Sequence, residues 1–384
     1  MNLLIFNALS WEQRKLEDIV EFLDTLRKPL TENTRTKGPY PYYGASGVVD
    51  HVADYLFNEE LILLSEDGAN ITDRNYPVCF LASGKYWVNN HAHVLRAKPK
   101  MDNNFICMSL ERKDYSNYNT GMAMPKLNQD TCRRIPVDCP SYEEQKKIGD
   151  YFRSLDNLIT LHQRKYEKLQ IIKKSMLENC FPKNGEKVPK IRFSGFARDW
   201  EQRKVGELLS ERIEQFPKSD EYPLMAFVAN EGVAPKGDRY DRSALVNDTE
   251  GKLYKRTEFG DFIYSSNNLE TGSIGLNKYG NATISPVYSI FRPTGIADSD
   301  FIGRRFVRKD FINEMVKWRQ GVIYGQWKIH EEDFLKIEVM VPSLEEQRRI
   351  GSFLDNLDHL ITLHQSELEK LQKIKKSLLE RMFV

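Results

Sequence analysis

Residues 140–181 read PSYEEQKKIGDYFRSLDNLITLHQRKYEKLQIIKKSMLENCF, and residues 342–383 read PSLEEQRRIGSFLDNLDHLITLHQSELEKLQKIKKSLLERMF. The two stretches align without a gap. They differ at 16 positions, and eight of these exchange Lys for Arg, Tyr for Phe, or one hydrophobic residue for another. Such an internal duplication indicates a repeated architecture and decides how the rest of the chain is interpreted.

Each copy is predicted to form one long helix. The S-x-x-E capping box at Ser141 and again at Ser343 marks the start of a helix. Apolar residues then recur in alternating steps of four and three, which average 3.5 residues, the coiled-coil period. We expect the helices to pair through Ile148, Phe152, Leu155, Ile159 and Leu169 in the first copy and Ile350, Leu354, Leu357, Ile361 and Leu371 in the second.

Polar residues occupy matched positions of the same apolar seam. His162 and Lys173 in the first copy correspond to His364 and Lys375 in the second. A polar residue at a seam position can fix the register of a coiled coil. We therefore favour a structural role for these residues over a pH switch.

A second short repeat divides the rest of the chain. WEQRK occurs at residues 11–15 and again at 200–204, and each copy opens the stretch that precedes a helix. The order is thus domain, helix, domain, helix, and a compact second domain requires the helices to run antiparallel. We expect domains at residues 1–140 and 189–341, a central helix with its linker at 141–188, and a C-terminal helix at 342–384.

The expected fold class is α/β (α+β), with two globular domains separated by two long antiparallel coiled-coil helices and a pseudo-two-fold internal repeat. Within the first domain, residues 11–26 are expected to form a short amphipathic helix. Residues 61–64 and 78–81 are apolar and are expected to form two short strands.

Composition excludes several classes of protein. The 384 residues are 40% hydrophobic, which suffices for two domains with cores of their own. No apolar run approaches the roughly 20 residues that cross a bilayer, and the opening MNLLIFNALS lacks the basic start of a signal peptide. We therefore expect a cytoplasmic protein with no membrane partner. The five cysteines include no C-x-x-C pair, so neither a disulfide framework nor a zinc site is predicted.

The motifs point away from catalysis. There is no Walker A loop, H-E-x-x-H, G-x-S-x-G, kinase signature or Asn/Asp-Pro-Pro-Tyr/Phe tetrapeptide. Asp102 followed by Glu111-Arg-Lys113 resembles a nuclease motif, but such a tripeptide is common by chance in a chain with 29% charged residues. His91 and His93 share one face of a strand, and a hydrogen-bonding role is favoured over metal ligation. No catalytic residue and no metal site are predicted.

Loops rich in amides, cations and aromatic rings suit the reading of bases instead. The net charge of +1 argues against non-specific coating of nucleic acid, so any DNA binding requires charges arranged by face or supplied by partners. In the first domain the candidate DNA-binding residues are Lys85, Tyr86, Asn89, Asn90, Met124 and Lys126. In the second they are Asn267, Asn268, Arg304, Arg305, Arg319, Tyr324, Gln326, Trp327 and Lys328.

The repeated P-S-x-E-E-Q-(K/R)-(K/R)-I-G helices, the WEQRK openings and stretches such as PYYGASGVVD and SPVYSIF together resemble the DNA-specificity subunit of Type I restriction-modification systems. The resemblance covers essentially the whole chain. One departure is visible: PKIRFSGFARD precedes Trp200 as is usual in that family, whereas MNLLIFNALS precedes Trp11.

The resemblance implies a non-catalytic subunit with two target-recognition domains, each reading one half of a split site in double-stranded DNA. The helices would set the gap and dock two modification (methyltransferase) subunits, with restriction subunits joining the full complex. S-adenosylmethionine is expected in the modification subunits, and no cofactor in this chain. The alternative from another class is a helical scaffold that dimerises and binds proteins; a self-sufficient nuclease is the third.

Overall fold

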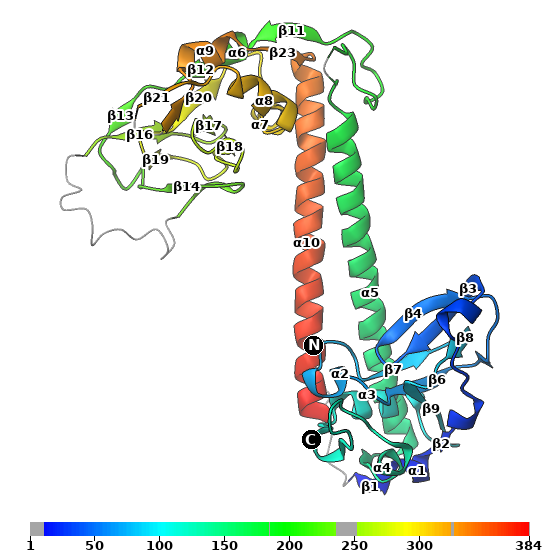
Figure 1. Cartoon of the computed structure of the whole chain (residues 1–384). Coiled ribbons are helices and arrows are strands. Elements are labelled where there is room, and N and C mark those ends of the chain that lie inside the picture. The colour runs from blue at the N-terminus through cyan, green and yellow to red at the C-terminus, as the bar shows by residue number, and fades with distance from the viewer. Residues whose placement is uncertain (1–10, 184, 236–251, 324–325, 384) are drawn as a thin grey trace. The chain divides into compact units, whose positions relative to one another are not determined.

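The computed structural model describes residues 11–183, 185–235, 252–323 and 326–383. The chain divides into two compact units (Figure 1). The first unit comprises Met1–Arg164 and Gln365–Val384, and the second comprises Lys165–His364. Each unit therefore contains one globular domain together with part of each long helix.

The duplicated stretches form the two long helices that were predicted, α5 (Tyr142–Asn179) and α10 (Leu344–Met382). In the first unit Lys375 of α10 pairs with Asp156 of α5 at 2.6 Å. In the second unit Lys173 of α5 pairs with Asp358 of α10. An early residue of one helix thus meets a late residue of the other in both units, so the helices run antiparallel, and the predicted fold class is confirmed.

The spacing of the apolar residues explains this pairing. The predicted seam positions are all buried or partly buried, from Ile148 and Phe152 near the start of α5 to Leu371 in α10. The seam lysines Lys173 and Lys375 each pair with an aspartate of the opposite helix, as expected of residues that fix register.

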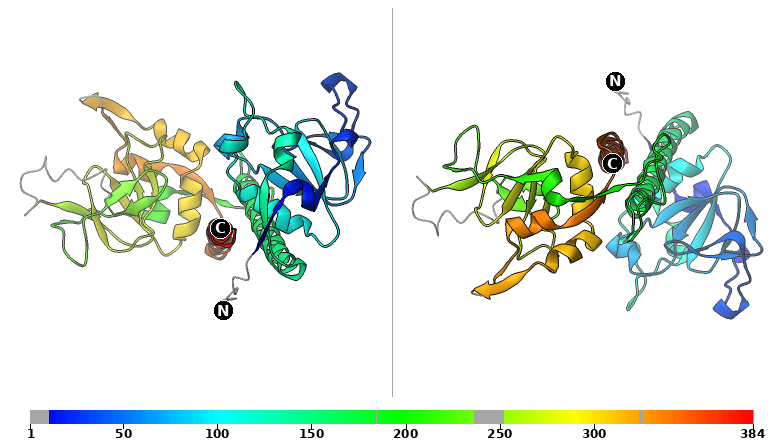
Figure 2. Two further views of the ribbon diagram at one scale, coloured as in Figure 1. Left: turned by 90° about the horizontal axis from the view of Figure 1, so that it is seen from below. Right: turned by 90° about the horizontal axis from the view of Figure 1, so that it is seen from above.

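The first domain has two four-stranded sheets, ordered β2-β9-β6-β7 and β4-β3-β8-β5, and a two-stranded sheet β1-β10. The predicted strands at 61–64 and 78–81 correspond to β6 and β7, which pair antiparallel, and α3 packs against both of them (Figure 2). The elements are β1 (Glu12–Lys15), α1 (Leu16–Ile19), β2 (Val20–Phe22), η1 (Asp24–Leu26), η2 (Glu32–Thr34), β3 (Lys37–Gly44), β4 (Gly47–Val52), β5 (Phe57–Asn58), β6 (Leu61–Ser65), α2 (Asn70–Asp73), β7 (Cys79–Ala82), β8 (Lys85–Val88), β9 (Ala92–Ala97), α3 (Asn103–Arg112), η3 (Ser116–Tyr118), α4 (Gln129–Arg133) and β10 (Pro136–Cys139).

The second domain is built around the sheet β12-β20-β17-β18, with a three-stranded sheet β13-β16-β19 and the pairs β11-β23, β14-β15 and β21-β22. Its elements are β11 (Glu201–Lys204), α6 (Val205–Leu208), β12 (Leu209–Glu211), β13 (Gln215–Phe216), β14 (Ala226–Val228), β15 (Gly232–Ala234), β16 (Tyr254–Thr257), β17 (Phe262–Tyr264), β18 (Ile274–Leu276), β19 (Ala282–Ile284), β20 (Ser289–Pro293), α7 (Ser299–Phe306), α8 (Lys309–Val316), β21 (Gln320–Ile323), β22 (Gln326–Lys328), α9 (Glu331–Lys336) and β23 (Glu338–Val341).

The WEQRK repeat forms a strand that pairs the start of each domain with its end. β1 pairs antiparallel with β10, the last strand before α5, and β11 pairs in the same way with β23, the last strand before α10. The helix expected over residues 11–26 is not found, because this segment instead forms β1, the single turn α1, β2 and η1. Its apolar residues Leu16 and Ile19 are buried in the domain core by that short turn.

The E-E-Q-x-x-I-G motif joins each domain to its helix. The Gln145 side chain accepts a hydrogen bond from the Asp102 backbone N–H (3.2 Å) and donates one to the Pro140 carbonyl (2.9 Å). Asp102 in turn caps α3 by accepting from the Phe105 N–H. A Cβ at Gly149 would collide with the Asp102 carboxylate, so glycine permits this close approach.

The second joint repeats the first. Gln347 accepts from the Asp298 backbone N–H (3.0 Å) and donates to the Pro342 carbonyl (3.0 Å), and Asp298 caps α7. Gly351 approaches Asp298 as Gly149 approaches Asp102. The duplicated motif is therefore a joint that fixes α3 of the first domain, and α7 of the second, against the first turns of the long helix.

The two joints differ in their ion pairs. In the first, Arg153 of α5 donates two hydrogen bonds to the Glu60 carboxylate of the domain, at 3.0 and 2.8 Å. The position that matches Arg153 in the second helix is Asp355, which accepts from Lys278 (2.7 Å) and Arg304 (2.8 Å) of the second domain. The sign of the charge on the helix is thus reversed between the two copies.

A matched aromatic cluster ends each long helix. In the first unit the ring of Phe383 lies against Phe105, Phe152 and Trp11, with ring centroids 5.3, 6.1 and 6.1 Å apart. In the second unit Phe181 lies against Phe301 (5.6 Å) and Trp200 (6.4 Å). The end of α10 therefore completes the core of the first unit, and the end of α5 completes the core of the second.

The predicted capping boxes are only half formed. The Ser141 and Ser343 hydroxyls each accept from the backbone N–H three residues later at 3.4 Å. The Glu346 carboxylate pairs with Arg192 instead of returning to its own helix start. Among the described residues, no helix is long and apolar enough to cross a membrane.

Candidate nucleic-acid interface

The first domain presents an exposed loop at residues 119–127, here called the methionine loop. Met122 is fully exposed, and Met124 is 60% exposed. Asn119 shapes the loop by accepting hydrogen bonds from the backbone N–H groups of Gly121 and Lys126, both at 2.9 Å. A Cβ at Gly121 would collide with the Met124 carbonyl, so only glycine allows this tight turn.

The base of the methionine loop is tied to β6 and its following turn. The Leu127 N–H donates to the Glu66 carbonyl at 2.7 Å, and the Gly68 N–H donates to the Pro125 carbonyl at 3.0 Å. The Glu66 N–H donates in turn to the His91 carbonyl in the turn between β8 and β9. The loop and that turn therefore lie together on one edge of the domain.

A buried charged network supports this edge. His93 donates from Nδ1 to Asp24 (2.6 Å) and from Nε2 to the Leu127 carbonyl (2.7 Å). Both ring nitrogens thus donate, as in the protonated imidazolium. Arg27 pairs with Glu66 at 2.7 Å, and Lys126 lies 3.6 Å from the same carboxylate. The network fixes the position at which the loop returns to the domain.

Burial by itself would lower the pKa of His93, but the hydrogen bond to Asp24, with Cys132 also near, outweighs it and raises the pKa to about 10. Burial acts to raise the pKa of Asp24, and the hydrogen bond from His93 outweighs it, so the pKa of Asp24 lies below its usual value. The folded-state pKa of His93 exceeds its ordinary value of 6.5. The contribution of the charged His93–Asp24 pair to the free energy of unfolding is therefore complete below about pH 6.5 and is lost as the pH rises through about 10.

Replacing His93 by alanine is expected to destabilise the first domain by about 3 kcal/mol at pH 7, because the buried Asp24 carboxylate loses a charged partner. The wild-type domain should lose stability between pH 7 and pH 10, and the His93→Ala domain should lose less. Thermal unfolding followed over this pH range checks both expectations.

His91→Ala is the matched control, since His91 pairs with Asp67 on the surface and its side chain is 50% exposed. It should cost less than about 1 kcal/mol. Parallel pH profiles for the wild type and His93→Ala would contradict the assignment of the charged state to His93.

The structure brings some of the predicted residues of the first domain together and separates others. Asn90, Met124 and Lys126 are exposed at the edge formed by the methionine loop and the β8–β9 turn. Asn89 is buried beneath that turn, where its side chain accepts from the His91 N–H at 2.8 Å. Lys85 is exposed at the other end of β8, with its ammonium 4.7 Å from the ring of Tyr55.

Tyr86 requires a correction. Its ring is completely buried and stacks on Phe57 with the centroids 5.6 Å apart. The alternation of side chains along β8 turns it inward, whereas the neighbouring Lys85 faces solvent. Tyr86 is a core residue and has no surface to offer to DNA. Met122, which was not predicted, is more exposed than any of the six candidates, and its position between Gly121 and Pro125 was the available signal.

In the second domain, the loop after β17 and the hairpin β21–β22 form a comparable surface. Asn267 accepts a hydrogen bond from the Trp327 backbone N–H (2.6 Å), and Ser266 accepts from the Ile329 N–H (3.0 Å). The Trp327 side chain is 46% exposed, and the Lys328 side chain is also exposed. Of the predicted residues, Asn267, Asn268, Trp327 and Lys328 are therefore brought together here.

Three predicted arginines are engaged in ion pairs. Arg319 pairs with Glu270 at 2.9 Å beside the same loop, and its side chain is largely buried. Arg304 reaches Asp355 and Asp358 of α10, and Arg305 is buried against Asp310 at 3.0 Å. Arg304 and Arg305 hold α7 in place and are corrected to structural residues. Tyr324 and the side chain of Gln326 lie outside the described residues.

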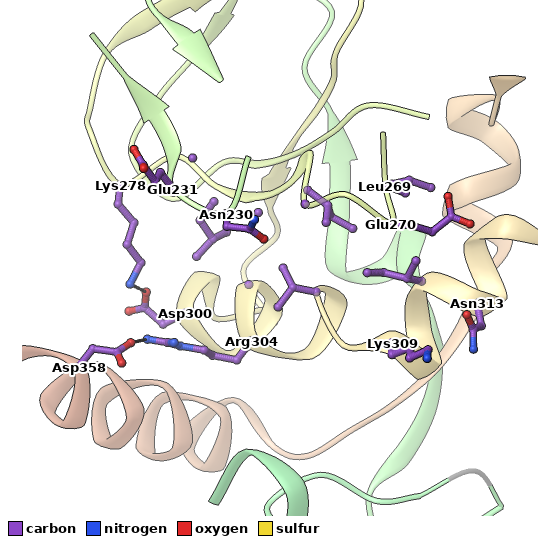
Figure 3. Close-up of a pocket in the computed structure, with 18 residues that line it drawn as sticks. Asn230, Glu231, Leu269, Glu270, Lys278, Asp300, Arg304, Lys309, Asn313 and Asp358 are labelled. Carbon is purple, nitrogen blue, oxygen red and sulfur yellow. Dashed lines mark hydrogen bonds and ion pairs between the residues drawn. The ribbon is translucent and has the colours of Figure 1, made fainter. Parts of the chain in front are cut away.

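The second unit also contains a cavity of about 690 Å³ between α7, α8, the loops of the β14–β15 and β17–β18 strands, and Asp358 of α10 (Figure 3). Lys278 spans its rim to Asp300 at 3.2 Å, and Arg304 faces Asp358 on the same side. These charges neutralise one another, so they do not form a set of groups converging on a ligand. No group of His, Cys, Asp and Glu among the described residues could hold a metal ion.

The residues of the nuclease-like motif are committed to structure. Asp102 caps the start of α3, whereas Glu111 near its other end accepts hydrogen bonds from the backbone N–H groups of Val78 and Cys79, both at 2.8 Å. Glu111 follows Asp102 by nine residues along α3, which places the two residues roughly 14 Å apart along the helix axis. They cannot bind one metal ion together, and the nuclease alternative loses its only support.

Two similar domains, each joined to a long helix and each exposing a loop surface, define a class of two-domain recognition proteins. The family described as Type I restriction modification DNA specificity domain matches residues 9–170 and 197–373. The chain belongs to this family, as the sequence resemblance predicted.

Two related proteins align with more than nine-tenths of this chain. A putative type I restriction enzyme specificity subunit of Haemophilus influenzae is 26% identical over 364 residues, covering 91% of this chain and 88% of the relative. The MjaVIII specificity subunit of Methanocaldococcus jannaschii is 25% identical over 402 residues, covering 96% and 91%. The crystal structure of a Type-I restriction-modification S subunit from M. genitalium superposes with a TM-score of 0.65 at 14% identity, covering 100% and 98%. That superposition supports the fold.

Proposed function

We propose that this chain is the non-catalytic DNA-recognition subunit of a Type I restriction-modification complex. Each domain reads one half of a bipartite site in double-stranded DNA, and the paired helices set the gap between the halves. The observation that carries this proposal is the repeated unit of domain, joint and long helix, with an exposed loop surface in each domain. Such a protein works where the DNA is, in the cytoplasm.

The side chains of the two loop surfaces suit contact with DNA. Met122 and Met124 are exposed apolar side chains of the kind that wedge between base steps, and Lys126 can contact a phosphate. Trp327 offers a flat exposed ring beside Lys328 in the second domain. With a net charge of only +1, the chain depends on partner subunits for part of the electrostatic attraction to DNA.

Two modification subunits are the partners that the helices suit. Leu158 and Leu161 of α5 are 45% and 46% exposed, and their counterparts Leu360 and Leu363 of α10 are 39% and 45% exposed. Exposed leucines at matched positions give each helix an equivalent apolar face for a protein partner. S-adenosylmethionine and the methyl-transfer residues then belong to those partners, restriction subunits join the full complex, and this chain needs no cofactor.

Substitutions in the two loop surfaces should act on different half-sites. Met122→Ala combined with Met124→Ala should weaken discrimination at one half-site, and Trp327→Ala should weaken it at the other, each by about 1–3 kcal/mol. Competition binding of the complex with its methyltransferase subunit, using DNAs altered in one half-site at a time, measures both effects.

Tyr76→Ala is a suitable control, since Tyr76 is 63% exposed in the first domain but belongs to neither loop surface. The Tyr76→Ala substitution should leave discrimination at both half-sites unchanged. A chain that forms no stable complex with a methyltransferase subunit, and whose binding to DNA is independent of sequence, would favour the scaffold instead.

A further inference from the structure

In the second unit, the segment that leads into Trp200 packs onto the start of α10. Arg192 donates two hydrogen bonds to the Glu346 carboxylate, both at 2.7 Å, and Glu346 is buried. The ring of Phe193 lies against Phe353 with the centroids 5.4 Å apart. The guanidinium of Arg349 lies 5.5 Å from the same Phe193 ring. An Arg-Phe pair thus covers one face of the first turns of α10.

The same face recurs at the start of α5, where no described residue makes the equivalent contacts. Glu144, Lys147 and Tyr151 match Glu346, Arg349 and Phe353 in the duplicated sequence. Tyr151 is 50% exposed and Tyr142 is 40% exposed, and Glu144 has no ion pair among the described residues. Tyr142 and Glu144 also line a cavity of about 490 Å³. Tyr142, Glu144, Lys147 and Tyr151 are here called the α5 patch.

The counterpart segment of this chain lacks the chemistry that fills the patch. Alignment of Trp11 with Trp200 places Leu3 and Leu4 at the positions of Arg192 and Phe193. Residues 1–10, MNLLIFNALS, contain neither lysine nor arginine, so no side chain of this segment can make the guanidinium pair that Arg192 makes with Glu346. The glutamate that matches Glu346 therefore has no arginine at the corresponding position of its own repeat, and Arg14 and Lys100, which line the same cavity, form no ion pair with it among the described residues.

We propose that the α5 patch is a docking site for an extended segment of another protein in which an arginine is followed by an aromatic residue. The arginine makes a bidentate pair with Glu144, as Arg192 does with Glu346. The aromatic ring packs on Tyr151, with the Lys147 ammonium over its face, as Phe193 packs between Phe353 and Arg349. A second copy of this chain is a poorer occupant, because its own Arg192 and Phe193 are already engaged. The proposal does not depend on DNA binding.

A fluorescein-labelled peptide with the sequence of residues 189–200, PKIRFSGFARDW, is the probe. It should bind the full chain, as measured by fluorescence anisotropy, and a peptide with alanine at both the Arg192 and Phe193 positions should bind at least tenfold more weakly. Glu144→Gln and Tyr151→Ala should each weaken binding of the unaltered peptide about tenfold. Both substitutions are at exposed or partly exposed positions and should leave the fold intact.

Leu158→Ala, an exposed apolar residue of the same helix outside the patch, should leave peptide binding unchanged. Replacing residues 1–10 by the sequence of residues 190–199 should fill the patch within the chain and abolish peptide binding. Failure of the peptide to bind, or equal binding to the Glu144→Gln and Tyr151→Ala variants, overturns the proposal. Two results would assign another occupant: peptide binding that requires deletion of residues 1–10, or a dimer in sedimentation that Glu144→Gln dissociates.

Discussion

Replacing Phe383 by alanine is expected to destabilise the first domain by about 3–5 kcal/mol, although this residue directly follows the C-terminal helix α10. Phe383 is only 5% exposed, and its ring lies among Trp11, Phe105 and Phe152. Alanine would leave a cavity between the start of the first domain, its helix α3 and α5. Hydrogen exchange of residues 103–112, followed by mass spectrometry, should accelerate markedly.

Phe181→Ala provides a matched control, since Phe181 occupies the equivalent position at the end of α5 and contacts Trp200 and Phe301. It should accelerate exchange in residues 299–306 of the second domain and leave the first domain protected. Each substitution thus has an effect that the other should lack. Equal loss of protection in both domains after either substitution would contradict the separate assignment of the two clusters.

The second large effect concerns the gap between half-sites under the proposed function. Asp156 of α5 pairs with Lys375 of α10, so residues 157–163 of α5 lie beside residues 368–374 of α10. Deleting both stretches removes one heptad from each helix and preserves the phase of the apolar seam. Each helix shortens by about 10 Å, and the gap is expected to shorten by about three base pairs.

Sequencing of methylated adenines in cells that express the shortened chain with its modification subunit would measure the new gap. Deleting residues 157–163 alone is the control, because it shifts one helix against its partner and should prevent assembly of the complex. Methylation that persists with an unchanged gap would show that the helices do not set the distance.

The long helices could be predicted from sequence because the information for them is local and present twice. The four-three spacing of apolar residues, read in both copies, identified the buried seam from Ile148 to Leu371. The paired strands β6 and β7 followed from short apolar runs in the same way. Residues 11–26 were assigned wrongly because apolar residues at helical spacing also suit a single turn flanked by strands, and pairing with the distant β10 decides between them.

The candidate site was predicted less well because exposure and partners depend on the tertiary structure. Nothing in the sequence near Arg304 indicates that it faces Asp355 and Asp358 of α10. The sequence at Tyr86 likewise does not say which face of β8 is turned inward. Residues in loops bracketed by glycine or proline, such as Met124, were better candidates because such loops lie on the surface.

The reversed ion pairs of the two joints affect how such a protein can evolve. Both joints hold a domain through backbone groups and an aspartate cap, which many sequences could provide, so recombination between genes could exchange whole domains. A domain carrying Glu60 that was moved to the second position would face Asp355, and one carrying Lys278 and Arg304 that was moved to the first would face Arg153. Partly exposed pairs of this kind contribute on the order of 1 kcal/mol each. The resulting loss of attraction or like-charge repulsion would disfavour chains in which a domain has moved to the other position, without preventing them from folding. Recombination would therefore tend to preserve the order of the two domains.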